Sequence, residues 1–304
     1  MSNLAKRAAI ACLIAALWIS RAGAEDPPVS TLVVGDKFQY TITRGDNFIK
    51  LGSRFGAGSA VLAAENGLKR ESRLTAGKTV EIDNRHVVPQ LLPDGIIVNP
   101  PQRMVFYLKG GKVIGAYPAA VGRVARQWRT PLGNFKVAEL RKDPTWHVPD
   151  SILREAEING KDLDDEVPPG PDNPLGAYWI GLSLDSVGIH STNSPLGIYG
   201  FRTHGCIRLR PENAEALFGA VDIGLPGEII YQPTLVAHLD DGHVFLEVNP
   251  DAYKRGVGGI NYVHRVADTH HLGDLINWPK AEEVADRAEG IARDVTAGGS
   301  GEER

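Results

Sequence analysis

A short stretch in the second half of the chain combines one cysteine with two histidines. His204, Gly205 and Cys206 are consecutive, and His190 precedes them. A thiolate is a far better nucleophile than a thiol, and a neighbouring imidazole can remove the thiol proton and hold the anion. We therefore expect Cys206 to be a nucleophile that a nearby histidine keeps ionised.

Two geometries bring a histidine to this cysteine. If residues 203–209 are extended, His204 and Cys206 fall on one face of the strand, because they are two residues apart. If residues 187–191 form a neighbouring strand, His190 lies beside Cys206. The pattern makes both histidines candidates for the base that activates the thiol.

The residues next to Cys206 can hold the rest of a substrate. Gly205 has no Cβ, so a substrate can approach the backbone, and the amides of Gly205 and Cys206 can donate to one oxyanion. One such donor is worth ~3 kcal/mol. Arg208 follows on the same face of an extended strand and can hold a carboxylate in a bidentate fork. The alternative for Arg208 is a structural ion pair.

Two other interpretations of these residues compete with the nucleophile. His190, His204 and Cys206 can bind zinc, although closed structural sites take four ligands and no fourth stands nearby. Cys206 can also be a buried, inert thiol with the histidines packed in the core. We favour the nucleophile and a site with no metal and no other cofactor.

The first residues have the three parts of a secretory signal peptide. Lys6 and Arg7 precede an apolar run over 8–19, and small residues follow at 22–24. The run is shorter than the ~20 apolar residues that span a bilayer. We predict a signal peptide over 1–24, export of the chain, and no stable membrane span after cleavage.

Cleavage would leave Cys206 without an intramolecular partner. The chain has two cysteines, and the other, Cys12, lies in the apolar run, where lipidation is its alternative fate. A single cysteine in an exported protein is an intermolecular partner, an inert thiol or a reactive group. The 304 residues carry a net charge of −4 and no basic run, so we expect no nucleic-acid partner.

Residues 37–84 have the pattern of a small separate unit. "FQYTI" and "KTVEI" have strand composition, and Phe48, Leu51 and Phe55 recur at helical spacing after Asp46, a helix-capping residue. The order strand, helix, helix, strand, with "YTITRGDNFIKLGSRFG" and "VLAAENGL", resembles a LysM domain, a module that binds N-acetylglucosamine-containing glycans such as peptidoglycan. The resemblance implies a βααβ glycan-binding module; the alternative is a unit that only packs against its neighbour.

Residues 94–233 contain short β-rich runs, among them "RMVFYL", "KVIGAYPA" and "AYWIGLSL". Regularly spaced strands are typical of a sandwich or barrel, so we predict a mainly β fold with one helix at 211–218. A long proline-rich, acidic segment interrupts the strands at 143–174. Long loops of this kind are often lids, and we expect Trp146 within it to line a cleft and contact substrate.

The remaining segments are predicted to be connections and a C-terminal extension made of a hairpin and a helix. Proline-containing stretches at 26–35 and 85–95 are typical of linkers. Residues 234–304 begin with a hairpin pattern and continue with a helix whose apolar stripe comprises Val284, Ala288, Ile291 and Val295. The final "GGSGEER" is expected to be disordered.

The stretch "IHSTN…THGCIRL" resembles the active-site signature of the YkuD-type L,D-transpeptidases. That signature is a histidine, a spacer, Ser/Thr-His-Gly-Cys, a hydrophobic residue, then Arg or Asn. "RTPLGNFKV" and "VPPGPDNPLG" also resemble members that follow a LysM module. The resemblance implies a β-sandwich-like catalytic domain over 94–233, with the small LysM-like domain in front of it.

By position, the resemblance implies a role for each residue of the signature. Cys206 would be the acylated nucleophile and His190 its general base, with the ring oriented by the backbone carbonyl of Ser191. His204 and Gly205 would shape the donor pocket and the oxyanion region. The positions expected to bind substrate are Ser191, Thr203, Arg208 and Trp146.

The implied reaction passes part of a peptidoglycan stem peptide to an amine in the periplasm. Cys206 would attack the amide that joins diaminopimelate at position three to D-Ala at position four, and an amine would then take the acyl group from the thioester. That amine can belong to a second diaminopimelate or to a lysine of an outer-membrane protein. With water as acceptor the protein would be an L,D-carboxypeptidase, and with a decayed site a non-catalytic peptidoglycan-binding protein.

Overall fold

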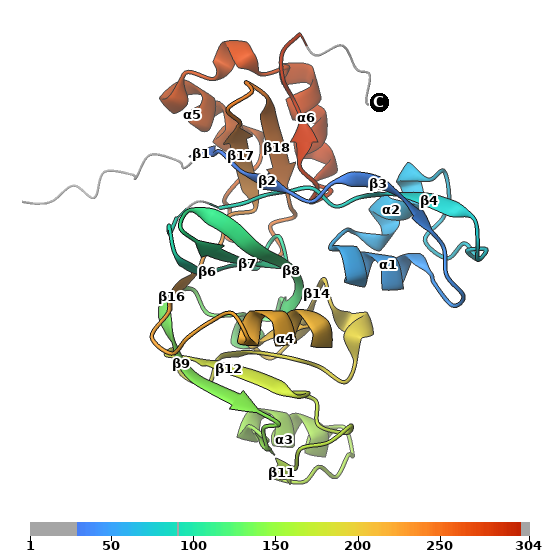
Figure 1. Cartoon of the computed structure of the whole chain (residues 1–304), viewed down its shortest axis with the longest axis vertical. Coiled ribbons are helices and arrows are strands. Elements are labelled where there is room, and N and C mark those ends of the chain that lie inside the picture. Colours follow the sequence, from blue (N-terminus) through green and yellow to red (C-terminus); the bar gives the residue numbers. More distant parts are fainter. Residues whose placement is uncertain (1–28, 90, 299–304) are drawn as a thin grey trace, which may run out of the picture.

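A computed structural model describes residues 29–89 and 91–298, and these form three units around a common junction (Figure 1). A large strand-rich unit spans the middle of the chain, a small unit precedes it, and a third unit follows it. The predicted signal peptide, Cys12 and residues 299–304 of the predicted disordered tail lie outside the described residues. Within the part of the chain that is described, no helix is both long and apolar enough to cross a membrane.

Nine strands of the middle unit form one sheet in the described part of the chain. Their order is β14-β8-β15-β13-β12-β9-β16-β6-β7, and β7 also pairs with β8, so all but β14 close into a barrel-like ring. The strands are β6 (Gly95–Asn99), β7 (Met104–Lys109), β8 (Lys112–Gly122), β9 (Gly133–Lys142), β12 (Tyr178–Leu182), β13 (Gly188–His190), β14 (Gly200–Thr203), β15 (Ile207–Leu209) and β16 (Pro226–Ile229). The predicted mainly β fold is confirmed.

Burial on both faces explains why the ring closes. Every residue of β6 is buried, because Ile96 and Val98 point into the ring while Ile97 packs with Phe106 of β7 on its outer side. β8 has 11 residues and pairs with β7 along its first part and with β14 and β15 along its last. Helix α4 (Pro211–Phe218), at the predicted position, contributes Ala214 and Leu217 to the same core.

The small unit has the predicted order of strand, helix, helix, strand. β3 (Lys37–Thr41) pairs antiparallel with β4 (Thr79–Asp83), and α1 (Phe48–Phe55) and α2 (Ser59–Glu65) lie between them in sequence. The N-cap of α1 is Asn47, whose side chain accepts the Lys50 N–H at 2.9 Å. Asp46, the predicted cap, instead accepts bonds from Thr43 in the preceding turn. The core comprises Ile42, Phe48, Leu51, Ala57, Leu62, Ala63, Val80 and Ile82.

The third unit is a compact layer of sheet and helices, in which the predicted hairpin is joined by further strands. Its sheet contains β17 (Thr234–His238), β18 (Val244–Val248), β19 (Arg293–Asp294) and, from the predicted linker over 26–35, β1 (Val29–Ser30) parallel to β17. Helices α5 (Ile260–His270) and α6 (Trp278–Arg287) pack on it.

The predicted helical stripe is interrupted at residue 288. Ala288 has a left-handed φ of 45° and Gly290 a φ of 72°, so α6 ends and the chain turns back to pair as β19 with β18. Ile291 and Val295 are buried from this extended segment. Ile291 and Val295, although four residues apart, are therefore buried in an extended segment and not on a helix.

In the stretch 85–95, also predicted to be a linker, residues 86–89 are buried where the three units meet. β5 (His86–Val87) pairs with β2 (Val33–Val34), and His86 bonds the Gly56 carbonyl of the small unit at 2.8 Å. Glu247 of β18 is fully buried beside it. The groups bonded to the Glu247 carboxylate, together called the Glu247 junction, are His86 at 3.1 Å, the Val87 N–H and Gln102 at 2.8 Å each, and Asn249 at 3.0 Å.

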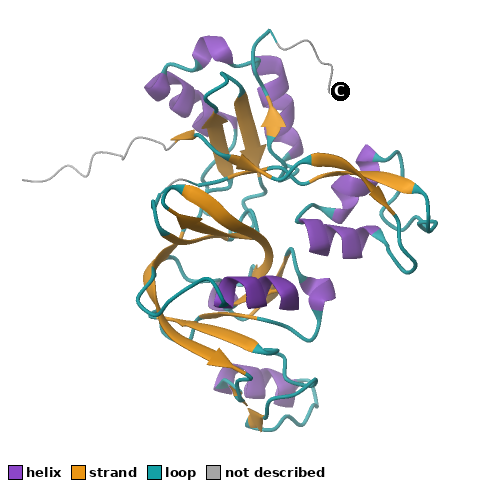
Figure 2. Cartoon of the chain, viewed as in Figure 1, coloured by secondary structure: helices purple, strands orange, loops and turns teal. Residues whose placement is uncertain are grey.

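The segment 143–174 forms a separate layer at the end of the molecule opposite α5 and α6 (Figure 2). It contains β10 (Trp146–His147), α3 (Asp150–Ile158) and β11 (Glu166–Val167), with β10 and β11 paired. The buried Asn173 amide donates to the Pro144 carbonyl at 2.8 Å and accepts the Leu175 N–H at 2.9 Å, which ties the two ends together. We call residues 143–174 the lid.

Candidate active site

Two neighbouring strands place three of the predicted site residues on one face of the sheet. β13 pairs in parallel with β15, with Ile189 opposite Ile207 and His190 opposite Arg208. Side chains alternate along a strand, so His190, Cys206 and Arg208 share the face opposite Ile189 and Ile207, which belong to the core. The strand pairing expected from the sequence is the one observed.

A cleft of about 270 Å³ opens over this face between the sheet and the lid. Cys206 is half-buried and lines it, and so does Trp146 from β10, as predicted for that residue. Trp179 of β12 lines it from the sheet. The other lining residues are Glu139, Arg141, Pro144, Thr145, His147, Pro149, Leu175 and Ser186.

The His190 ring is fixed and electrically neutral. It is 4% exposed, and its Nδ1 bonds the Ser191 carbonyl at 2.6 Å, the contact that the sequence predicted. With Nδ1–H donating to that oxygen, Nε2 is the nitrogen that can accept a proton. The Leu175 backbone also bonds the ring. Burial, and then the charge of Arg208, lower the pKa of His190 to about 3. The ring is therefore a neutral base at physiological pH.

The Cys206 thiol is also neutral in this arrangement. It points to the Ser186 carbonyl, with Sγ 3.7 Å from the oxygen. Burial raises the pKa of Cys206, and the Gly188 N–H and the Arg208 charge only partly offset this. The expected thiolate held by an imidazole is thus replaced by a thiol beside a neutral imidazole, because both groups are desolvated and each loses its charged form.

The backbone turns between His204 and Cys206, so the extended piece expected there is wrong. Gly205 has a φ of +124°, a conformation that glycine adopts far more readily than other residues. The hydroxyl of Thr203 accepts the Gly205 N–H at 3.2 Å and donates to the Cys206 carbonyl at 2.5 Å. The buried Thr203 therefore positions the turn and offers no hydroxyl to a substrate, and the Gly205 amide, expected to be free, is engaged.

The turn directs His204 towards the lid. Its ring lies edge-on to Trp128 with centroids 4.3 Å apart, and its Nε2 lies 2.5 Å from a carboxylate oxygen of Glu155 on α3. Arg123 contacts His204 and bonds both oxygens of Glu155, at 2.9 and 2.8 Å. The bonds from Arg123 and then from His204 lower the pKa of Glu155 to about 2. We call Arg123, Glu155 and His204 the lid contact.

Arg208 carries a charge that is not paired. It is half-buried, and no carboxylate of residues 29–89 or 91–298 forms an ion pair with it. Its Nε is buried without a hydrogen-bond partner among those residues. Burial lowers the pKa of Arg208, which is the cost of holding this cation on the sheet face that carries Cys206. The geometry favours the substrate-binding alternative over a structural ion pair.

The zinc interpretation requires His190, His204 and Cys206 to converge. His204 instead turns to Glu155. Across the described ranges, no group of three or more His, Cys, Asp or Glu side chains is placed to hold a metal ion. These three residues therefore do not form a zinc-binding set.

Sequence reasoning missed several residues that shape the site. The Trp179 ring stacks on His190 with centroids 6.0 Å apart and covers Gly188, where a Cβ would meet the indole at 2.4 Å. Alternation along "AYWIGL" places Trp179 on the face of the sheet opposite the core residue Ile180, so the sequence could have predicted its place beside His190. Ser186 and Glu155 gave none, because each meets the site only through the fold.

Comparison with known proteins adds an independent line of evidence. Residues 93–229 match the model of the YkuD family, the L,D-transpeptidase catalytic domain. The chain is 29% identical over 286 residues to "Probable L,D-transpeptidase ErfK/SrfK" of Salmonella typhimurium, covering 90% of this chain and 91% of that protein. It is 30% identical over 228 residues to the protein of the same name in Escherichia coli strain K12, covering 73% and 72%.

A solved structure is also similar, the catalytic domain of an L,D-transpeptidase from E. faecium. The two are 26% identical, the similarity covers 46% of this chain and 98% of that one, and the TM-score is 0.35. The family match lies over the strand-rich unit that carries Cys206, and the relatives extend the similarity over most of the chain. The chain belongs to the YkuD family and is an L,D-transpeptidase.

Proposed function

We propose that this enzyme works through an acyl-enzyme on Cys206 and takes its acyl group from peptidoglycan stem tetrapeptides. The observation that carries the proposal is the shared face of β13 and β15, which presents a thiol, a neutral imidazole and an unpaired cation. The cleft over this face gives a peptide access to the sulfur. Such a set can cleave an amide and pass the acyl group to an amine.

The first half-reaction forms a thioester. His190 Nε2 takes the thiol proton as the Cys206 sulfur attacks the carbonyl carbon of the diaminopimelate L-centre. The Ser191 carbonyl, bonded to Nδ1, stabilises the imidazolium that forms. His190 then gives the proton to the amine of D-Ala as the C–N bond breaks. The thiol reaches His190 by rotating away from Ser186 about its staggered side-chain torsion.

The second half-reaction releases the sulfur. An acceptor amine attacks the thioester carbon and gives a proton to His190, the C–S bond breaks, and the sulfur regains a proton from His190. Space for the substrate at Gly205 is open, since a Cβ there would meet only the Arg129 carbonyl, at 3.7 Å. Arg208 would hold a carboxylate of the donor peptide.

We also propose the division of labour along the chain. Residues 1–24 would direct export to the periplasm, 37–84 would be a LysM-like module that binds the glycan, and 94–233 would carry catalysis. The support is the βααβ order of the small unit and the buried bond from His86 to Gly56, which joins that unit to its neighbours.

Three acceptors fit this chemistry. A second diaminopimelate would give a cross-link, a lysine of an outer-membrane protein would give a tether, and water would make the enzyme an L,D-carboxypeptidase. Digestion of cell-wall sacculi by the mature protein, followed by analysis of the muropeptides, separates the three by their products.

The test of the acyl-enzyme is the intact mass of the mature protein after incubation with a carbapenem. We expect the mass of one carbapenem to be added to the wild type and none to Cys206→Ala. Ser186→Ala is the matched control, because it changes a residue that lines the cleft and keeps both the nucleophile and the backbone carbonyl that the sulfur contacts. An unmodified wild type, or an adduct retained in Cys206→Ala, would contradict the proposal and favour a non-catalytic wall-binding protein.

A further inference from the structure

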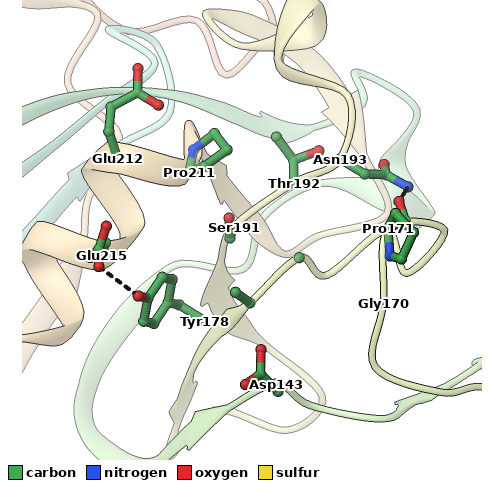
Figure 3. Close-up of a pocket in the computed structure, with 12 residues that line it drawn as sticks. Asp143, Gly170, Pro171, Tyr178, Ser191, Thr192, Asn193, Pro211, Glu212 and Glu215 are labelled. Carbon is green, nitrogen blue, oxygen red and sulfur yellow. Dashed lines mark hydrogen bonds between the residues drawn. The ribbon is translucent and has the colours of Figure 1, made fainter.

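A second, larger cavity lies behind the catalytic histidine. It has a volume of about 700 Å³ and is bounded by the two ends of the lid, by Ser191 and by the start of α4 (Figure 3). Neither Cys206 nor His190 lines it. Asn193 donates to the Pro171 carbonyl at 3.3 Å along one side. We call this cavity the rear pocket.

The walls of the rear pocket are negatively charged. Asp143, Glu212 and Glu215 line it, and its lining contains no lysine or arginine. Glu212 is neutralised by Arg210 at 2.6 Å and also offsets the dipole at the start of α4. Glu215 accepts the Tyr178 hydroxyl at 2.7 Å, and neither it nor Asp143 forms an ion pair within residues 29–89 and 91–298. Two carboxylates therefore face this space uncompensated.

A buried hydroxyl also faces the rear pocket. Ser191 is 1% exposed and lies in the middle of the view in Figure 3. Its carbonyl is used by His190, but within the described ranges its hydroxyl has no hydrogen-bond partner. Gly176 keeps the space in front of it open, because a Cβ at Gly176 would lie 2.7 Å from the Ser191 oxygen. A ligand in the rear pocket can therefore hydrogen-bond this hydroxyl without displacing a protein partner.

The rear pocket and the Cys206 cleft are divided by the start of the lid and by the residues that directly follow its end. Asp143 lines the rear pocket and the next residue, Pro144, lines the cleft. Likewise Gly176 lines the rear pocket and its neighbour Leu175 lines the cleft. Ser191 connects the two through its carbonyl bond to His190. A ligand in the rear pocket therefore touches both lid ends and the residue that orients the base.

We propose that the rear pocket binds a cationic group, an ammonium or guanidinium, carried by the acceptor. This rests on the proposed transfer to an amine. Asp143 and Glu215 give the rear pocket an unpaired negative charge, whereas the unpaired cation Arg208 shares the sheet face of Cys206 and does not line the rear pocket. A cation bound there would join the lid end at Asp143 to α4 at Glu215 and would donate to the Ser191 hydroxyl.

The test is calorimetric binding to full-length mature protein carrying Cys206→Ala, so that no turnover is needed. The probes are acetyl-arginine amide and acetyl-citrulline amide, which have the same shape and differ in charge. We expect the arginine probe to bind roughly fivefold more tightly, and less so in 0.5 M salt. Adding Asp143→Asn and Glu215→Gln should bring the ratio to about one. Glu282→Gln, an exposed change on α6, is the matched control and should leave the ratio unaltered.

Equal binding of the two probes, or a preference that survives the Asp143→Asn and Glu215→Gln changes, overturns the cation site. Carbapenem acylation of the wild type is a separate measurement of the proposed function. If the protein prefers the arginine probe but is never acylated, the cation site is supported and the acyl-enzyme is contradicted. Failure of one proposal can therefore be told from failure of the other.

Discussion

The lid contact and the Glu247 junction both pair a histidine with a glutamate, but in opposite surroundings. In the lid contact the side chains of Glu155 and His204 are 37% and 25% exposed. In the junction those of Glu247 and His86 are 0% and 1% exposed. The first pair joins α3 to the turn before Cys206, and the second joins the three units of the molecule.

The difference in exposure separates a contact that can open from one that cannot. Exposed ion pairs are weak and screened by salt. A buried carboxylate that loses its partners is strongly destabilising, because donors are left without acceptors. The lid can therefore move over the cleft while the small unit stays fixed. Two more bonds hold the small unit: the Ser53 hydroxyl donates to the Pro195 carbonyl at 2.6 Å, and Arg293 bonds Glu65.

The largest effect is expected from Glu247→Ala. The change leaves His86, Gln102, Asn249 and the Val87 N–H without their acceptor, so the free energy of unfolding should fall by about 3–5 kcal/mol. Urea denaturation measures it, with Glu282→Ala on the exposed face of α6 as control. A loss below about 1 kcal/mol would mean that the junction resembles the lid contact.

The same variant has a signature in pH. Burial raises the pKa of Glu247, but the charge of His86 and bonds from His86, Asn249 and the Val87 N–H outweigh it, so the pKa is lowered. A carboxyl with a depressed folded pKa adds stability above its unfolded pKa, about 4.3, and loses it as pH falls through the folded value. The difference in the free energy of unfolding between wild type and Glu247→Ala should therefore become smaller below pH 4.

The next effect concerns the cleft that the lid covers. Because the pKa of Cys206 is raised, the alkylation rate with iodoacetamide should rise about tenfold per pH unit from pH 6 to 9. No inflection is expected near 6.5, since the pKa of His190 is about 3. A plateau reached by pH 7 would instead reveal a resting thiolate–imidazolium pair, and Cys206→Ala supplies the blank.

Local pattern was enough to predict the strands that carry the site. Period-two spacing put Cys206 and Arg208 on one face, and a neighbouring strand over 187–191 was expected to bring His190 beside them, as the β13–β15 pairing does. The βααβ order also came from short-range signals such as Gly56, which ends α1 with a φ of 79°.

The features that the sequence did not predict depend on partners that are distant along the chain. Glu155 is 49 residues from His204, and Glu247 is 161 residues from His86, so neither bond leaves a local trace. Two strands of the third unit, β1 and β19, were not predicted, because each has two residues and they complete the sheet from opposite ends of the described chain. The prediction of an ionised Cys206 did not allow for burial, which raises the pKa of the thiol and acts only after folding.

The smallest effect, and the sharpest for the comparison, is expected from Glu155→Gln. The amide removes the charge that holds Arg123 and His204, so the lid should open more often and Cys206 should be alkylated about threefold faster at pH 8.

The urea midpoint of Glu155→Gln should barely change, in contrast to Glu247→Ala. Glu157→Gln is a matched control, an exposed glutamate on the same helix outside the lid contact. Salt at 1 M should speed alkylation of the wild type and have little effect on Glu155→Gln, because it screens the charge that this variant has already lost. Equal salt responses in the two proteins would mean that the ion pair does not control the lid, and the distinction between an opening contact and a fixed junction would then rest on burial alone.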